Sequence, residues 1–261
     1  MSSLLRVSVA QLAICWEDRI GNLRKIGKRL KRLSGTTDLV ILPETFSTGF
    51  SMNVSNLAET MDGNTMSTLK KWANEFDFAI AGSFIAKEEN RYYNRAFFIT
   101  PEGDCQTFDK RHLFRMGGEQ NFYAAGNSRE IVRYRGWNIR LLVCYDLRFP
   151  IWSRNFDNAY DLLVYVANWP ESRATVWNTL LPARALENLT FVCGVNRVGT
   201  DGNNLSYSGN SVIYSPRGKK LLYIPSHKEA VRTCTLNKEE ANSLREKFPA
   251  WKDADKIHFI E

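Results

Sequence analysis

Apolar positions along the chain follow two alternating patterns. Runs in which every residue or every second residue is apolar predict β-strands over residues 4–12, 38–42, 78–85, 92–100, 137–143, 162–167, 190–196 and 229–235, and a further strand that ends at residue 109. Apolar residues three and four positions apart predict helices over residues 18–34, 65–75, 148–156, 174–187 and 238–247, followed by a polar tail. A polar loop is predicted over residues 110–127 and a hairpin around residues 216–218. Alternating strands and helices predict an α/β protein.

The two halves of the chain repeat this scheme. The apolar residues 39–42 lead to Glu44, and residues 162–166 lead to Asn168 and Trp169 at the corresponding place in the second half. Strands that are apolar on both faces are usually covered by helices or by a second sheet. No Pro-, Gly- or Ser-rich stretch separates the two halves. We therefore predict one domain over residues 1–261, with two sheets face to face and helices outside them.

Composition narrows the class of protein. The chain has 261 residues, of which 44% are hydrophobic and 24% charged, a mixture that is typical of globular proteins and excludes disordered and collagen-like chains. No apolar run approaches the roughly 18 residues of a membrane span. The first residues lack the basic region and cleavage site of a signal peptide. We expect a cytoplasmic protein that has no membrane partner.

Cysteine and histidine patterns argue against structural cross-links. The five cysteines are an odd number and none has CxxC spacing, which argues against a disulfide framework. The three histidines form no HExxH motif and no paired Cys/His pattern, which argues against zinc. We expect no metal and no cofactor.

The net charge of +7 is concentrated between Arg24 and Arg32. Apolar residues spaced by three and four run through the same segment, so its basic residues form one face of an amphipathic helix. A nucleic-acid patch is one interpretation, but aromatic residues between the charges and a binding motif are both missing. A solvated helix face is the preferred interpretation, and we expect no nucleic-acid partner.

Four residues with chemically useful side chains come directly after predicted strands: Glu44, Lys110, Cys144 and Asn168. Functional residues in α/β sheets gather just past the carboxyl ends of the strands. Each residue also has an ordinary explanation when it is taken alone. A cysteine on an apolar strand is usually a small buried hydrophobe, Glu44 could cap a helix, and Lys110 could belong to a solvated charge run.

The surrounding sequences change this picture. The chain reads Leu-Val-Ile-Leu-Pro-Glu-Thr-Phe around Glu44, Phe-Asp-Lys-Arg-His-Leu-Phe around Lys110, and Leu-Leu-Val-Cys-Tyr-Asp-Leu-Arg-Phe-Pro around Cys144. In this order they resemble the three motifs of the nitrilase superfamily of carbon–nitrogen hydrolases, and the resemblance covers nearly the whole chain. It implies a four-layer αββα sandwich and a catalytic triad of Glu44, Lys110 and Cys144. It also implies a second glutamate, which maps onto Glu119 in Met-Gly-Gly-Glu.

These residue types can support amide hydrolysis. A free cysteine is only about 3% thiolate at pH 7, so it needs a partner that accepts its proton, and Glu44 suits that role. Lys110 and the backbone N–H of Tyr145 are the expected oxyanion donors. We also expect a helix that begins near Arg148 to favour the thiolate through its dipole. A Cys144–His112 dyad is a competing arrangement.

Longer stretches, at residues 144–155, 165–173, 196–203 and 247–255, are similar to the bacterial omega-amidase branch of the superfamily. This resemblance implies hydrolysis of the distal amide of small dicarboxylic monoamides, such as 2-oxoglutaramate, 2-oxosuccinamate and succinamate. Two alternatives stay open. One is an amidase for N-carbamoyl amino acids or aliphatic amides, and the other is a binding protein without activity on the same fold.

Such a substrate carries a carboxylate, which a planar guanidinium reads well. Three arginines follow central strands. We expect Arg148 to stabilise a helix start and to pair with Asp146, and Arg197 either to read the carboxylate or to cap the loop at Gly199. Arg173 is the remaining candidate: it either binds the carboxylate, which we predict, or is a surface arginine at a helix start. Asn168 and Trp169 are predicted as further substrate-binding residues.

The resemblance also implies a homodimer that packs through the helix after Cys144 and the C-terminal tail. Trp152 and Trp251 could anchor that interface, or both could be core residues.

Overall fold

Two six-stranded β-sheets form the centre of the computed structural model, which describes residues 3–255 and 257. The first sheet contains β1 (Leu4–Gln11), β2 (Leu39–Ile41), β3 (Ala79–Glu88), β4 (Arg91–Ile99), β5 (Cys105–Asp109) and β14 (Ala230–Asn237), in the order β14-β1-β2-β3-β4-β5. The second contains β6 (Val132–Tyr134), β7 (Trp137–Val143), β8 (Leu162–Ala167), β9 (Phe191–Asn196), β12 (Val212–Tyr214) and β13 (Lys220–Tyr223), in the order β13-β12-β9-β8-β7-β6. Strands β1, β2 and β3 are parallel, as are β7, β8 and β9.

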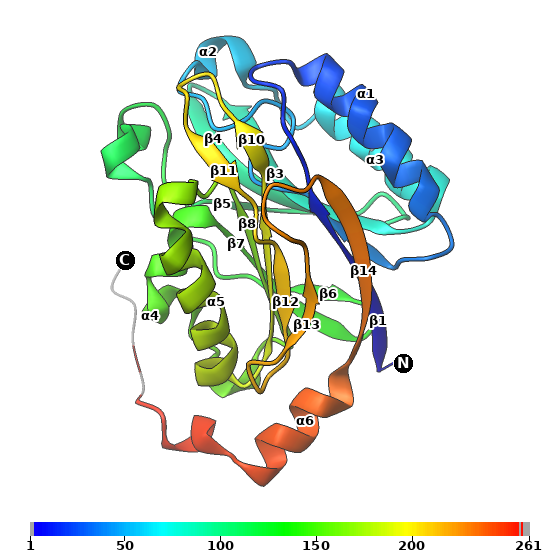
Figure 1. The fold of residues 1–261 in the computed structure, drawn as a ribbon, viewed down its shortest axis with the longest axis vertical. Helices are drawn as coiled ribbons and strands as arrows, with labels where there is room; N and C mark the ends of the chain where they lie inside the picture. Colours follow the sequence, from blue (N-terminus) through cyan, green and yellow to red (C-terminus); the bar gives the residue numbers. More distant parts are fainter. Residues whose placement is uncertain (1–2, 256, 258–261) are drawn as a thin grey trace.

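Helices cover the outer faces of the two sheets (Figure 1). Helices α1 (Arg19–Leu30) and α3 (Asn64–Phe76) lie over the first sheet, and α5 (Ala174–Asn188) and the short α4 (Pro150–Ser153) lie over the second. Helix α6 (Lys238–Lys247) follows β14 at the end of the molecule that is lowest in the figure, and α2 (Val54–Leu57) is a single turn near the opposite end. The architecture is a four-layer αββα sandwich, which confirms the predicted fold class.

Alternating side chains explain why both central strands are wholly apolar. In β2, Leu39 and Ile41 belong to the core between the sheets, whereas Val40 packs under α1 and α3. Strand β8 behaves in the same way: Leu162, Val164 and Val166 face the other sheet, and Leu163, Tyr165 and Ala167 face α5. Each strand is buried on both sides because it separates two cores, as its apolar sequence indicates.

The predicted helix over residues 148–156 is wrong. The structure has a 3₁₀ helix at Cys144–Arg148 and then the four-residue α4. Phe149 is extended because it precedes Pro150, and the residue before a proline is disfavoured in helical conformation. Helix α4 ends quickly, since the Ser153 hydroxyl bonds back to the carbonyls of Phe149 and Pro150 and Arg154 is extended.

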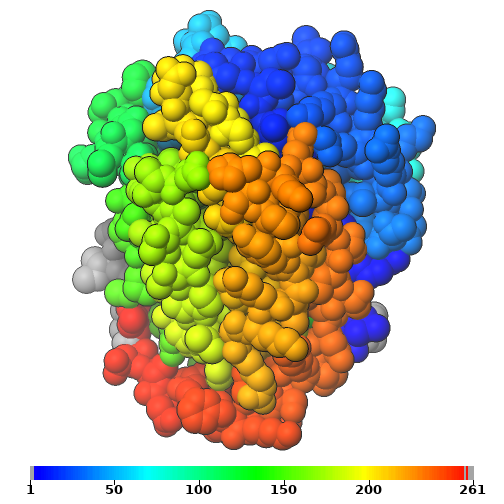
Figure 2. Space-filling view, viewed as in Figure 1, coloured from blue at the N-terminus to red at the C-terminus, as the bar shows by residue number. Residues whose placement is uncertain are grey.

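The sequence patterns also missed several short elements, namely β6, α2 and a small hairpin formed by β10 (Val198–Thr200) and β11 (Ser206–Ser208). Arg197 fixes the base of this hairpin: its guanidinium donates to the carbonyls of Ile14, Val198 and Thr200. Figure 2 shows the hairpin (yellow) packed against the N-terminal segment (blue). Arg197 therefore holds the loop around Gly199, as one of the two expectations for it stated.

Part of the basic face of α1 forms ion pairs within the molecule. Lys25 and Arg29 both form ion pairs with Glu229, at 2.8 and 2.6 Å, and so join α1 to the segment before β14. Trp152 is a core residue with 6% of its surface exposed, whereas Trp251 is half-buried. No helix within residues 3–255 is long and apolar enough to cross a membrane. The end of the predicted polar tail lies outside the described residues.

Candidate active site

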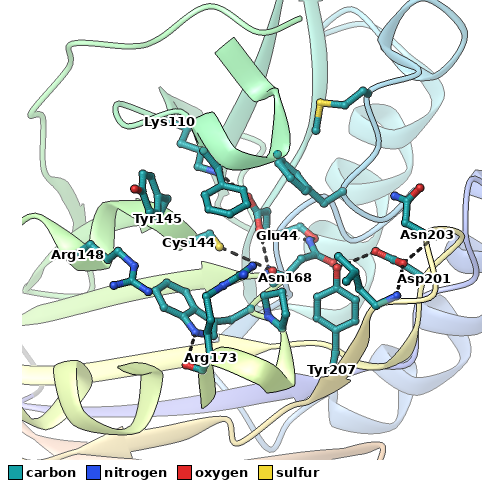
Figure 3. Close-up of a pocket in the computed structure, with 17 residues that line it drawn as sticks. Glu44, Lys110, Cys144, Tyr145, Arg148, Asn168, Arg173, Asp201, Asn203 and Tyr207 are labelled. Atoms are coloured by element: carbon teal, nitrogen blue, oxygen red, sulfur yellow. Dashed lines mark hydrogen bonds and ion pairs between the residues drawn. The ribbon is translucent and has the colours of Figure 1, made fainter. Parts of the chain in front are cut away.

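The carboxyl ends of four strands meet at one edge of the sandwich. Glu44 lies just beyond β2 and Lys110 directly after β5, a strand that runs in the same direction as β2. Cys144 and Asn168 directly follow the parallel strands β7 and β8 of the second sheet. All four side chains line one pocket (Figure 3). The structure therefore brings together the residues that the sequence placed after strands.

Three buried charges cluster at this pocket, which Glu44 and Lys110 line. The Lys110 ammonium lies 3.0 Å from Glu44 Oε1 and 3.0 Å from Glu119 Oε2. None of the three residues is more than 1% exposed. Burial alone would lower the pKa of Lys110, but the charges of Glu119 and Glu44 outweigh it and hold that pKa well above its usual value. Burial raises the pKa of Glu119 while Lys110 opposes the rise. Lys110 is consequently a fixed cation.

Two asparagines hold the Glu44 carboxylate. Asn94 in β4 donates to Glu44 Oε1 (2.7 Å) and to Glu119 Oε1 (3.3 Å). The backbone N–H of Asn168 donates to Glu44 Oε2 (2.7 Å), and the Asn168 side chain donates to the Glu44 carbonyl (2.8 Å). Sequence reasoning missed Asn94. The signal that could have revealed it was an amide that, together with Arg95, interrupts the buried and otherwise apolar half of a strand.

Cys144 has a left-handed backbone, with a φ of +44°. Non-glycine residues adopt this conformation at a cost, and a strained turn between a strand and a helix is a common way to present a nucleophile. The thiol is partly exposed at the pocket and lies 3.9 Å from the carbonyl oxygen of Asn168.

The expected dipole effect on the thiol is wrong. Burial raises the pKa of Cys144 well above its usual value, and the neighbouring Glu44 charge raises it further, although Lys110 opposes both. A 3₁₀ helix of only five residues offers little dipole to set against these effects. The resting cysteine is a neutral thiol beside a carboxylate that can accept its proton.

Two hydrogen-bond donors reach this pocket from different sheets. The Lys110 ammonium reaches the pocket from the end of β5. Tyr145 is the second residue of the 3₁₀ helix, and the first backbone N–H groups of a helix have no partner within it. The backbone N–H of Tyr145 is therefore available beside Cys144.

The His112 side chain does not form the hydrogen bond that a Cys144–His112 dyad requires. Its ring Nδ1 lies 2.8 Å from Asp146 Oδ1, and its ring stacks on Phe149 with centroids 3.7 Å apart. Within residues 3–255, no hydrogen bond joins this imidazole to the Cys144 thiol.

Two arginines also line this pocket. The Arg148 guanidinium lies 5.4 Å from the ring centroid of Trp169, and that of Arg173 lies 5.1 Å from the ring of Phe114. Neither forms an ion pair with any described carboxylate. The expected Arg148–Asp146 pair is therefore wrong, because His112 and backbone N–H groups occupy Asp146.

The hairpin closes the side of the pocket opposite Arg148 (Figure 3). Asp201 accepts hydrogen bonds from the backbone N–H groups of Asn203 and Leu205 and from the Tyr207 hydroxyl. Trp169 is held by its own bonds, from its backbone N–H to Asn196 and from its indole to the carbonyl of Arg173. Among the described residues, no three His, Cys, Asp or Glu side chains gather as a metal site would need.

This fold and these motifs define a hydrolase class. The carbon–nitrogen hydrolase family matches residues 6–246, and the chain belongs to this family. The chain is therefore an enzyme of a class that cleaves carbon–nitrogen bonds, as the sequence predicted.

Individual relatives are more specific. The chain is 43% identical to omega-amidase YafV of Escherichia coli, over 97% of this chain and 98% of that protein. It is 30% identical to 2-oxoglutaramate amidase of Bacillus subtilis, over 96% and 97% of the two chains. A solved CN-hydrolase superfamily protein from Xanthomonas campestris, with an arsenic adduct in its active site, is 44% identical and superposes with a TM-score of 0.96 over 98% of this chain and 99% of that one.

Proposed function

We propose that this protein is an omega-amidase, which hydrolyses the distal amide of small dicarboxylic monoamides such as 2-oxoglutaramate, 2-oxosuccinamate and succinamate. The observation that carries the proposal is a single pocket lined by a thiol, a buried carboxylate and two arginines that have no carboxylate partner among the described residues. The names of the relatives that align over nearly the full length support the same activity.

In the first step, Cys144 Sγ attacks the amide carbonyl carbon while Glu44 accepts the thiol proton. The carbonyl oxygen becomes an oxyanion, which the Lys110 ammonium and the Tyr145 backbone N–H stabilise. The carbon–nitrogen bond then breaks as Glu44 returns its proton to the nitrogen. Ammonia leaves, and a thioester joins the acyl group to Cys144.

In the second step, Glu44 removes a proton from water, and the resulting hydroxide attacks the thioester carbon. The same two donors bind the new oxyanion. The carbon–sulfur bond breaks, the sulfur recovers its proton from Glu44, and the dicarboxylate leaves. Glu119 keeps Lys110 in place through both steps, since its second oxygen is anchored by the backbone N–H of Phe114.

Arg173 reads the carboxylate at the far end of the substrate. Its guanidinium is held over Phe114 without an acidic partner among the described residues, so a substrate carboxylate would supply the missing charge. Asn168 and Trp169 form the adjoining wall. An uncharged aliphatic amide would leave this cation uncompensated, which favours omega-amides over general aliphatic amides. An N-carbamoyl amino acid stays an alternative substrate because it also carries a carboxylate.

We also propose that the enzyme works as a cytoplasmic homodimer. Its five free cysteines suit a reducing compartment. Ile151 on α4 is about half-exposed beside a groove that Ile257 also lines, which would suit an interface between two copies. Sedimentation equilibrium should give twice the mass of one chain, and a species with the mass of one chain would remove the dimer.

The function is tested by ammonia release from 2-oxoglutaramate, succinamate, N-carbamoyl glycine, butyramide and glutamine, with Cys144→Ala as the control. We expect the first two to be the best substrates and the variant to be inactive. Iodoacetamide labelling of Cys144 separates the remaining alternative. A binding protein without activity would turn over no amide and would leave Cys144 unmodified.

A further inference from the structure

The two oxyanion donors of the proposed mechanism belong to different sheets. Lys110 follows β5 of the first sheet, and its ammonium bonds only to Glu44 and Glu119 among the described side chains. Tyr145 lies in the turn after β7 of the second sheet. Donors that act on one oxygen atom must keep a fixed spacing, because a misplacement of about 1 Å can cost roughly 100-fold in rate. A contact between the two loops has to set that spacing.

His112 and Asp146 make this contact. Each lies two residues after one member of the proposed triad, His112 after Lys110 and Asp146 after Cys144. The backbone N–H and the ring Nδ1 of His112 lie 3.0 and 2.8 Å from the same oxygen, Asp146 Oδ1. The other oxygen, Oδ2, accepts the backbone N–H of Val143 at 3.1 Å. One buried carboxylate thus ties the lysine loop to the turn that carries the cysteine.

Two aromatic rings from the residues after the cysteine contact the imidazole of His112, whose side chain is 24% exposed. It stacks on Phe149 with nearly parallel rings, 6° apart, and meets the edge of Trp152 at 83°. Asp146 is 1% exposed, so its charge depends on these few donors. Because a carboxylate only accepts, Nδ1 of His112 carries the hydrogen. All of these contacts of the His112 ring are made with residues 146–152. None of them is made with a residue of the first sheet that lines the pocket.

We propose that His112 is a positioning residue: its Nδ1–H bond to Asp146 sets the distance between the Lys110 ammonium and the Tyr145 N–H, and so tunes the oxyanion site. The inference rests on the proposed amidase function. It assigns His112 no proton transfer with Cys144. Phe114 and Tyr145 also touch across the two loops, with ring centroids 5.2 Å apart, but an edge-to-face ring contact fixes spacing less strictly than a hydrogen bond to a buried carboxylate.

A matched pair of variants tests the proposal. In His112→Asn the side-chain amide nitrogen can take the place of Nδ1, whereas in His112→Gln it is displaced by one methylene group. We expect His112→Gln to lose roughly 10–100-fold in kcat with KM unchanged, because only the transition state carries the oxyanion. His112→Asn should keep most of the wild-type kcat. Alkylation of Cys144 by iodoacetamide, followed by mass spectrometry, should proceed at the wild-type rate in both variants, since attack at a saturated carbon forms no oxyanion.

Three results would overturn the proposal: wild-type kcat in His112→Gln, equal losses in the Asn and Gln variants, or alkylation rates that fall together with kcat. The last would mean that His112 acts on the thiol itself. Thermal melting identifies a Gln variant that fails to fold, and His112→Ala then takes its place in the comparison with His112→Asn. A wild-type protein that releases no ammonia would refute the amidase function and this inference with it, whereas an active wild type with indifferent variants would refute the inference alone.

Discussion

The pocket has two groups of charged residues, which the proposed mechanism places at the reacting end and at the far end of the substrate, and the two groups differ in how their charge is compensated. At the reacting end, Glu44, Lys110 and Glu119 are buried, and hydrogen bonds from Asn94 and Asn168 hold the Glu44 carboxylate. At the other end, Arg148 and Arg173 rest on aromatic rings and meet no carboxylate within the described part of the chain. The charges at the reacting end are compensated within the protein, whereas the two arginines have no anion among the described residues as a partner.

In the proposed mechanism the first group serves catalysis and the second serves recognition of the substrate. Fixed and compensated charges at the reacting end can stabilise an oxyanion without rearranging, which is the most effective form of electrostatic catalysis. Uncompensated cations at the far end gain most when a substrate brings its own carboxylate. Substitutions at the first end should therefore affect every amide, and substitutions at the second should affect charged amides alone.

The largest effect should come from Glu44→Gln. The amide cannot accept the thiol proton or return it to the leaving nitrogen, so kcat should fall by roughly 10²–10⁴-fold on charged and uncharged amides alike. Stopped-assay ammonia measurements on succinamate and butyramide check this. A loss on succinamate only would mean that Glu44 takes part in substrate recognition and not in the chemical step.

Lys110→Met should follow, with a loss of roughly 10²–10³-fold in kcat, the usual cost of one oxyanion donor. It also leaves Glu44 and Glu119 as close, uncompensated carboxylates, so the melting temperature should drop. Adding Glu119→Gln to this variant should restore part of the melting temperature but none of the kcat. Recovery of both would show that Lys110 acts only by balancing charge.

Arg173→Met examines the far end. Loss of one charge-assisted pair costs about 1.5–3 kcal/mol, which corresponds to roughly 10–150-fold in kcat/KM. The loss should fall on succinamate and 2-oxoglutaramate, and butyramide should be nearly indifferent. Arg148→Met is the matched control, because Arg148 likewise lies over an aromatic ring, that of Trp169, in the same pocket. Equal losses on charged and uncharged amides in Arg173→Met would mean that this residue supports the fold or the chemical step.

The smallest change concerns the pH dependence of thiol reactivity. Because burial and Glu44 raise the pKa of Cys144, the reactive thiolate is a minor species at neutral pH and increases about tenfold with each pH unit. Alkylation of Cys144 should still accelerate between pH 8.5 and 9.5, roughly where a free thiol levels off. In Glu44→Gln the pKa should fall, since a negative charge is removed. A rate that is already constant below pH 7 would point to a thiolate stabilised by a neighbouring cation.

The reacting end was readable from the sequence, and its surroundings were not. Glu44, Lys110 and Cys144 follow apolar strands, and strands of this kind can be located because they are buried on both faces. Glu119 begins a single turn of 3₁₀ helix in a segment without apolar periodicity, so only the family resemblance pointed to it. Asn94 was missed because its role depends on the order of the strands from β2 to β5, and this pairing order is not visible in local patterns.

The far end was harder for a physical reason. Whether an arginine reads a ligand or pairs with a neighbour depends on the tertiary position of every nearby carboxylate. The sequence put Asp146 two residues before Arg148, yet the fold gives that carboxylate to His112. The predicted helix after Cys144 failed because one proline outweighed an otherwise helical spacing.

The pairing of β14 with β1 has a consequence for how the chain is made. Eight residue pairs, from Leu4 with Asn237 to Gln11 with Ala230, join the first strand to the last. During synthesis β1 therefore emerges long before β14, and the edge of β1 that pairs with β14 stays uncovered until β14 has been made. An uncovered edge strand is a template for association with other chains, and contacts this distant in sequence form slowly. The ribosome-bound chain must keep that edge protected until its last strand arrives.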